Sequence, residues 1–186
     1  YGYPRADIRN RIAAGRYNSW VETRHVVFSH GQESGPWGSK ITALAAVAGA
    51  KGFATHSVDY RGIDDARARV AKLHADCATL PNAPILCGSS MGAYVTVAAA
   101  ADLRARAVFL LAPALLLPGL PSLLDTALDC PVTLVQGWRD DVVRYEQTVQ
   151  FAARHRYSLH VLNSDHRLSD CMPTLCCLFD HFLGTA

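Results

Sequence analysis

The chain has 186 residues, of which 50% are hydrophobic and 18% carry a charge, and its formal net charge is +2. This composition excludes an intrinsically disordered chain, and so small a net charge gives no indication of nucleic-acid binding. No apolar run approaches the roughly 20 residues of a membrane-spanning helix. We therefore expect one globular domain over residues 1–186, with residues 1–24 as a basic, peripheral N-terminal segment.

The cysteines follow no regular framework spacing and form no C-x-x-C pair. They stand at Cys77, Cys87, Cys130, Cys171, Cys176 and Cys177. We expect them to be free thiols of a reducing compartment, with no zinc site and no other metal. The first residues lack the charged, apolar and cleavage regions of a signal peptide, so a cytoplasmic location is expected.

After the opening segment, apolar runs alternate with helix-forming stretches along the chain. Strands are predicted near residues 25–29, 53–58, 84–88, 107–112, 132–136 and 158–162, and helices near 39–50, 64–79, 91–102, 144–155 and 173–183. The run 108–111 is apolar throughout, which indicates a strand buried on both faces, as in a parallel sheet between helices. The pattern predicts a three-layer α/β fold with a mostly parallel sheet of about six strands.

The first predicted strand, 25–29, runs into the turn His30-Gly31-Gln32. A histidine in a His-Gly loop more often hydrogen-bonds locally and shapes the turn than takes part in chemistry. We expect that structural role for His30. Gln32 follows His30-Gly31 directly, and its expected role depends on the serine motif at residues 88–92.

Residues 88–92 read Gly-Ser-Ser-Met-Gly, between a predicted strand and a helix of small residues. A G-x-S-x-G turn holds its serine at a strained, positive-φ position, and flanking glycines let strand and helix approach closely. We predict that Ser90 is a catalytic nucleophile; the alternative is a glycine-rich turn that only packs. In this arrangement the amide after the nucleophile, Met91, is one oxyanion-hole donor, and we assign the second to Gln32.

Residues 113–131 follow the next strand and are rich in leucine and proline. The segment is too short for a large lid, so any cap is rudimentary and the predicted site is open. Leu115, Leu116 and Leu117 could form an apolar wall that binds an acyl chain. The alternative, in which these leucines pack into the core, is at least as well supported by the pattern.

A nucleophilic serine needs a base and an orienting acid, which here are expected in the order acid, then histidine. Asp140 and Asp141 follow the predicted strand 132–136, at the edge of the sheet where parallel α/β folds bind ligands. We prefer Asp140 because it fits a G-x-x-D-x-V spacing, while Asp141 competes for the role. If Asp140 is the acid, Asp141 is expected to cap the helix that starts near Arg144.

Among the eight histidines, His166 lies in a polar loop directly after the last predicted strand, 158–162, and before the last helix. That loop is where the base must lie to reach Ser90, so we predict His166 as the base. The alternative is an ordinary exposed loop histidine. Asp165 is its immediate neighbour, and a neighbour rarely has the geometry to orient the ring.

Three stretches also carry a family resemblance. They are His30-Gly31 with Ser34, Pro36 and Lys40; residues 88–92 with Tyr94; and Asp140, Val142, Tyr145, Gln147, Val149 and His166 with residues 182–184. On these residues the chain resembles the α/β-hydrolases, and more narrowly the small, capless bacterial esterases of the YqiA type. Gln32 and Ala93 depart from that pattern, as does the stretch 59–62.

The resemblance implies an α/β-hydrolase fold with a minimal cap or none, and Ser90, Asp140 and His166 in the triad positions. It also implies hydrolysis of small-molecule acyl esters or thioesters, a reaction that requires no cofactor. Acyl transfer or carbon–carbon hydrolysis by the same triad, and a non-catalytic binding protein of this fold, are the alternatives. The sequence does not indicate an oligomeric state.

Overall fold

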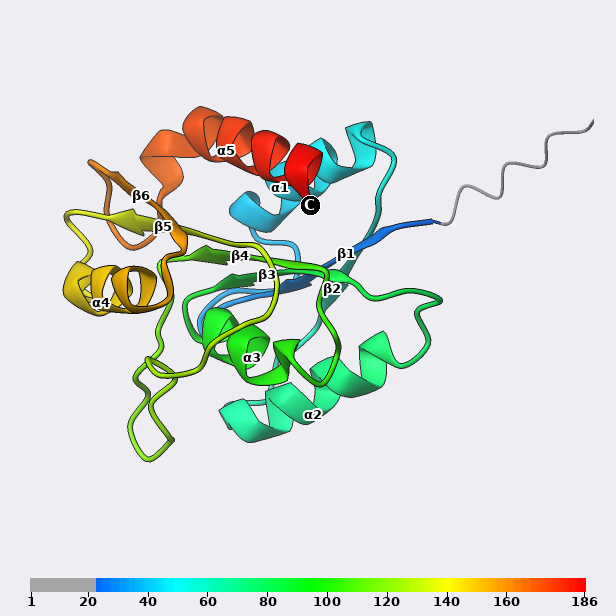
Figure 1. Ribbon diagram of the computed structural model, residues 1–186, viewed down its shortest axis with the longest axis horizontal. Helices are drawn as coiled ribbons and strands as arrows, with labels where there is room; N and C mark the ends of the chain where they lie inside the picture. The colour runs from blue at the N-terminus through cyan, green and yellow to red at the C-terminus, as the bar shows by residue number, and fades with distance from the viewer. Residues whose placement is uncertain (1–22) are drawn as a thin grey trace, which may run out of the picture.

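The computed structural model describes residues 23–186 and shows a single parallel sheet between two layers of helices (Figure 1). Most of the predicted peripheral segment, residues 1–22, lies outside the described residues. The strands are β1 (His25–Ser29), β2 (Ala54–Val58), β3 (Ile85–Ser89), β4 (Ala107–Leu111), β5 (Val132–Gly137) and β6 (Ser158–Leu162). They pair in the order β2-β1-β3-β4-β5-β6, and every pair is parallel.

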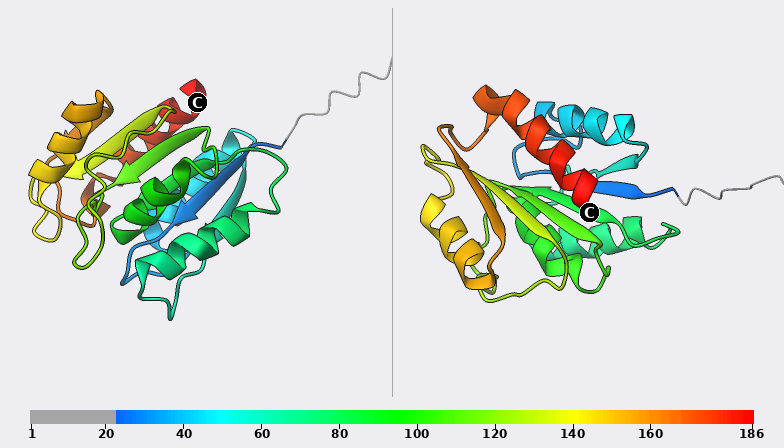
Figure 2. Two further views of the ribbon diagram at one scale, coloured as in Figure 1. Left: turned by 60° about the horizontal axis from the view of Figure 1, so that its bottom comes forward. Right: turned by 45° about the horizontal axis from the view of Figure 1, so that its top comes forward.

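Helices cover both faces of the sheet, which confirms the predicted three-layer fold (Figures 1 and 2). One face carries α1 (Ser39–Ala50) and α5 (Met172–Thr185). The opposite face carries α2 (Ala66–Cys77), α3 (Met91–Ala100) and α4 (Tyr145–His155). A short 3₁₀ turn, η1 (Ser169–Cys171), precedes α5 and was not predicted from the sequence.

Each face of the sheet has its own hydrophobic core. All five residues of β4 are buried, because its side chains point alternately into the two cores. On the α1 and α5 side, the ring of Phe109 lies 5.0 Å from that of Phe179 and 5.1 Å from that of Phe182, between ring centroids. On the other side, Phe151 of α4 is fully buried with residues of α2 and α3.

The predicted elements agree with the observed ones to within about two residues at each end. Residues 113–131 contain neither helix nor strand, so the fold is capless as expected. Between residues 23 and 186, none of the helices combines the length and the apolar character that crossing a membrane requires.

The sheet order also defines where a ligand crevice should open. The chain passes from β1 outward to β2 and then returns to β3, on the other side of β1. The carboxyl ends of β1 and β3 therefore flank a topological switch point, which is the usual ligand site of an open parallel sheet. The loops that begin at His30 and Ser90 both start at this point.

Candidate active site

Ser90 occupies the turn between β3 and α3 with φ 55° and ψ −123°, which confirms the predicted positive φ. Its N–H donates to the carbonyl of Leu111 at 2.9 Å, and its own carbonyl accepts from Ala93 at 2.9 Å and from Ala114 at 3.2 Å. A non-glycine residue in such a conformation costs about 1–3 kcal/mol, which the surrounding structure must offset. These three hydrogen bonds hold the strained turn in place.

The two glycines of the motif allow the close approach of strand and helix that this turn requires. A Cβ at Gly88 would lie 2.6 Å from the Gly92 carbonyl oxygen and 2.7 Å from the Ala93 Cα. A Cβ at Gly92 would overlap the carbonyl group of Ser29 at the end of β1. Only glycine fits at either position without moving backbone.

The hydroxyl of Ser90 lies at one end of a chain of hydrogen bonds. Its Oγ is 3.0 Å from Nε2 of His166, and Nδ1 of the same ring is 2.9 Å from Oδ2 of Asp140. An ionised carboxylate only accepts, so Nδ1–H donates to Asp140 and the unprotonated Nε2 accepts from the Ser90 hydroxyl. Three loops, which follow β3, β5 and β6, thus bring these side chains together at one edge of the sheet.

Asp140 is buried and accepts hydrogen bonds at both oxygens. Oδ1 accepts from the N–H groups of Val142 at 3.0 Å and Val143 at 2.7 Å, while Oδ2 also accepts from Nε2 of Gln136 at 2.8 Å. Burial by itself would raise the pKa of Asp140, but the hydrogen bonds from His166, Val143 and Val142 outweigh it and lower the pKa below its usual range. The carboxylate is therefore held ionised.

Asp141 does not have the capping role predicted for it. Helix α4 begins at Tyr145, its N-cap is Arg144, and no side chain caps it. Asp141 precedes that cap by three residues and is exposed. The amides of Val142 and Val143 are instead bound by Asp140, and the histidine bonds to Asp140 rather than to Asp141.

The two adjacent aspartates give a direct test of this arrangement. We expect Asp140→Asn to lower kcat for the predicted ester hydrolysis by roughly 10³–10⁴-fold, because an amide cannot hold the histidine in the required tautomer. Asp141→Asn is the matched control and should keep wild-type kcat. Steady-state kinetics of both variants measures the difference, and an equal loss in the two would contradict the assignment.

The lowered pKa of Asp140 also predicts how stability depends on pH. A carboxyl whose pKa is lower in the folded chain stabilises the fold above its unfolded pKa of about 3.9, and this contribution is lost as pH falls through the folded pKa. Urea midpoints measured from about pH 5 to pH 2 should show the gap between wild type and Asp140→Asn closing as pH falls. A gap independent of pH would argue against this role.

Two buried polar residues, His30 and Arg69, hold the loop after β1. His30 is buried; its Nδ1–H donates to the Gly31 carbonyl at 2.7 Å, and its Nε2 accepts from the Tyr60 N–H at 2.9 Å. Burial lowers the pKa of His30, which favours this neutral form. These bonds agree with the predicted structural role of His30 in the turn.

Arg69 of α2 packs against the same loop, and its side chain is only 1% exposed. Its Nη1 lies 3.4 Å from the His30 carbonyl oxygen and 3.3 Å from that of Gly31, and its Nε donates to Ile63 at 2.6 Å. One guanidinium therefore contacts three backbone carbonyls, of which that of Gly31 also accepts from His30. Arg69 fixes the position of the segment that leads to Gln32.

Removing this guanidinium should affect both stability and turnover. We expect Arg69→Met to lower the free energy of unfolding by about 3 kcal/mol, because it removes the hydrogen bonds of a buried, charged guanidinium to backbone carbonyls. We also expect kcat of the predicted ester hydrolysis to fall by roughly tenfold with little change in KM, because a displaced loop misplaces Gln32, the predicted second oxyanion donor. Arg67→Met, on an exposed position of the same helix, is the control; equal behaviour of the two variants would refute this role.

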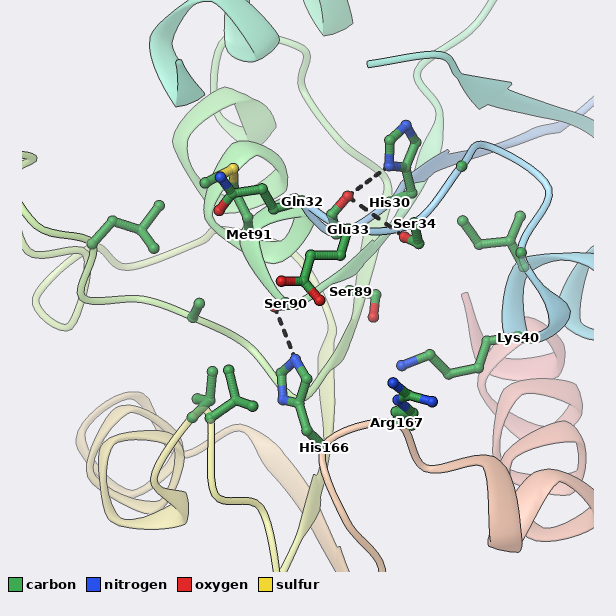
Figure 3. Close-up of a pocket in the computed structure, with 18 of the residues that line it drawn as sticks. His30, Gln32, Glu33, Ser34, Lys40, Ser89, Ser90, Met91, His166 and Arg167 are labelled. Carbon is green, nitrogen blue, oxygen red and sulfur yellow. Dashed lines mark hydrogen bonds between the residues drawn. The ribbon is translucent and has the colours of Figure 1, made fainter. Parts of the chain in front are cut away.

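A cavity of about 730 Å³ opens over Ser90 and His166 (Figure 3). Of the predicted site residues, Gln32, Met91, Leu116 and Leu117 line it as well. Gly31 brings the loop against the serine, since a Cβ there would lie 3.4 Å from the Ser90 Cβ.

Leu115 does not line this cavity, contrary to the predicted acyl wall. Its side chain is fully buried in the core on the α2 and α3 side, while Leu116 next to it is 49% exposed. The loop thus directs neighbouring leucines in opposite directions, one into the core and one toward the cavity.

Four polar residues of the site were not recognised as functional candidates from the sequence. Gln136 binds Asp140 and is itself held by Thr148 at 2.9 Å, Arg69 holds the loop after β1, and Lys40 and Arg167 line the cavity. For one of them the sequence held a signal, because Gln136 is a polar residue inside the apolar run that forms β5. Lys40 stood in the resemblance motif without an assigned role.

Comparisons with known proteins agree with this architecture. The chain matches the model of the Alpha/beta hydrolase family over residues 26–179. No curated protein matches it significantly. A proposed hydrolase of the alpha/beta superfamily from Xanthomonas campestris pv. campestris is 27% identical, with 88% of this chain and 99% of that chain covered and a TM-score of 0.83.

Two more distant solved structures share the fold. An alpha-beta serine hydrolase homologue from Coxiella burnetii is 23% identical, with 87% of this chain and 85% of that chain covered and a TM-score of 0.73. An esterase from Pyrococcus furiosus is 16% identical, with coverages of 87% and 81% and a TM-score of 0.71. The family match spans most of the chain and agrees with the parallel sheet and the serine turn. This chain belongs to the alpha/beta hydrolase family.

Proposed function

We propose that this protein is a serine hydrolase that cleaves acyl esters or thioesters through a covalent acyl-enzyme. The observation that carries the proposal is the continuous chain of hydrogen bonds from the Ser90 hydroxyl through His166 to the buried carboxylate of Asp140. A serine, a base and an orienting acid in this order are what nucleophilic acyl transfer needs. The likeness to an esterase and a serine hydrolase homologue supports the same chemistry.

In the proposed reaction, Ser90 Oγ bonds to the carbonyl carbon while its proton passes to Nε2 of His166. The tetrahedral intermediate collapses, the bond to the leaving oxygen or sulfur breaks, and His166 returns the proton to the leaving group. Water then attacks the acyl carbon and gives a proton to His166. The bond from that carbon to Ser90 Oγ breaks, His166 returns the proton to Oγ, and the acid is released. Asp140 stabilises the imidazolium formed in each half of the reaction.

The negative charge that develops on the substrate's carbonyl oxygen needs hydrogen-bond donors that are already in position. Met91 is the first residue of α3, so its N–H has no intrahelical acceptor and is available to the oxyanion. Gln32 would supply the second N–H from the loop that His30 and Arg69 hold. Each donor of this kind typically contributes roughly 10²–10³-fold to kcat.

Further features support a small esterase. Leu116 and Leu117 line the cavity and would contact the acyl chain. The capless segment 113–131 and the His30-Gly31 motif support a place near the YqiA-type esterases within the family. All six cysteines are free, which supports a reducing, cytoplasmic setting.

A fluorophosphonate probe tests the proposal without knowledge of the natural substrate. A fluorophosphonate reacts with an activated serine, so we expect the intact protein to gain one phosphonyl group, located on Ser90 by peptide mass spectrometry. A 4-nitrophenyl ester series from acetate to palmitate then gives the acyl-length preference. Absence of labelling together with absence of ester hydrolysis would favour a non-catalytic binding protein.

A further inference from the structure

Lys40 differs from the two other lysines of the chain. Lys51 pairs with Asp180 at 3.1 Å and Lys72 with Asp76 at 3.4 Å, both on the outer surface. Lys40 instead lies half-buried in the wall of the cavity that contains Ser90. Within the part of the chain that the structure describes, no carboxylate oxygen lies within 4.0 Å of its ammonium group.

The surroundings of Lys40 do not favour a positive charge. Burial lowers its pKa, and the more distant carboxylates of Asp140 and Asp165 only oppose that effect. Lys40 is also the second residue of α1, at the end of the helix that carries partial positive charge. Both effects disfavour a positive charge on Lys40. An anion bound in the cavity would stabilise the charged ammonium group.

A second cation faces the same cavity. Arg167 follows His166 directly in the chain, and its exposed side chain lines the same cavity as Ser90 and His166. Figure 3 shows Lys40 and Arg167 on the same side of the cavity, away from Met91 and Gln32. Arg167 makes no ion pair with a described residue.

The remaining titratable groups of the cavity wall do not balance these two charges. His30 is buried in its neutral form, and His166 is bound to Asp140. Glu33 is the acidic residue of the wall; it is exposed and pairs with neither cation among the described residues. Among the side chains that line the cavity, two cations therefore face one carboxylate; the ionised Asp140 lies behind His166 and, like Asp165, outside the lining.

We propose that Lys40 and Arg167 bind an anionic group of the substrate, so that the preferred substrates are esters or thioesters with a carboxylate on one half. This rests on the proposed ester hydrolysis at Ser90. A carboxylate can accept from the lysine ammonium and from the planar fork of arginine at the same time. The cavity of about 730 Å³ has room for both the reacting ester and the anionic group.

Matched substrates test the proposal. Mono(4-nitrophenyl) adipate and 4-nitrophenyl hexanoate have acyl chains of equal length and differ by the terminal carboxylate. The measured quantity is the ratio of kcat/KM for the anionic ester to that for the neutral ester. We expect Lys40→Met to lower this ratio about tenfold and Arg167→Gln to lower it by a few-fold, as for hydrogen bonds to charged groups.

Two further variants control for general charge effects. Glu33→Gln should raise the same ratio, because it removes a like charge from the cavity wall. Lys51→Met, at the opposite end of α1, should leave the ratio unchanged.

A second substrate pair shows which half of the substrate contacts Lys40. 3-Carboxyphenyl hexanoate carries the anion on its leaving group, and 3-carbamoylphenyl hexanoate is its neutral match. An unchanged ratio in Lys40→Met for both pairs would overturn the proposal.

A binding measurement separates this proposal from the proposed reaction. Isothermal titration of mono(4-nitrophenyl) adipate into Ser90→Ala protein should show binding that Ser90→Ala/Lys40→Met loses. That result would support the anionic subsite even if no ester were hydrolysed, in which case the proposed reaction alone would fail. Hydrolysis of neutral esters by the wild type with no dependence of anion binding on Lys40 would reject the subsite and leave the reaction standing.

Discussion

Ser90→Ala is expected to reduce the hydrolysis of 4-nitrophenyl esters by about 10⁴–10⁶-fold, to the level of the oxyanion hole and binding alone. The variant removes one oxygen, whose partner in the structure is Nε2 of His166 at 3.0 Å. The backbone bonds of the turn to Leu111, Ala93 and Ala114 do not involve the side chain. Alanine at φ 55° is no more strained than serine, so the fold and its melting temperature should be retained.

Ser158→Ala is the matched control for this experiment. Ser158 is exposed at the start of β6, outside the cavity wall, so its substitution should leave kcat/KM at the wild-type value. Circular dichroism and a melting curve on both variants establish that they fold. Ester hydrolysis above about one per cent of wild type in folded Ser90→Ala would show that another group is the nucleophile.

Gly92→Ala is expected to have the largest effect on stability. The added Cβ would overlap the carbonyl group of Ser29, the last residue of β1, which is paired with strands on both sides. Backbone on both sides must then move, and overpacking of this kind costs about 3 kcal/mol or more. Urea denaturation should therefore show a clearly lower midpoint, and ester hydrolysis should fall in parallel because the serine turn is displaced.

Gly49→Ala provides a control of opposite sign. Gly49 lies in the last turn of α1, and beyond the helix's own backbone nothing lies within 4 Å of a Cβ built there. Alanine is the better helix former by about 0.5–1 kcal/mol, so this variant should be slightly more stable than wild type. If Gly92→Ala instead kept the wild-type midpoint, the close contact between β1 and α3 would not be needed for the fold.

Local patterns in the sequence were sufficient for the fold and for the motif at its centre. Apolar runs alternate with helix-forming stretches, and the glycines around Ser90 indicate a sharp turn between a strand and a helix. Each signal depends on neighbouring residues, so it can be read without knowledge of distant contacts. The loops with Asp140 and His166 could be identified because parallel strands bring their carboxyl ends to the same edge of the sheet.

Side-chain direction within those loops was decided only by the tertiary structure. Asp140 and Asp141 are adjacent, as are Leu115 and Leu116, and in each pair one residue turns inward and the other outward. The sequence pattern preferred Asp140 but assigned Asp141 a capping role that it does not have, and it gave no basis for separating the leucines. Loop dihedrals have no fixed period, so contacts with distant elements determine these directions.

The supporting polar residues also required the three-dimensional structure. Arg69 is separated by almost forty residues from the loop that it holds, and Lys40 lines the cavity from the start of α1. Neither has a local pattern that distinguishes it from a solvated surface residue. The sequence by itself therefore determined the family, the order of the elements and the residues predicted to react. Long-range packing determined how those residues are oriented, supported and charged.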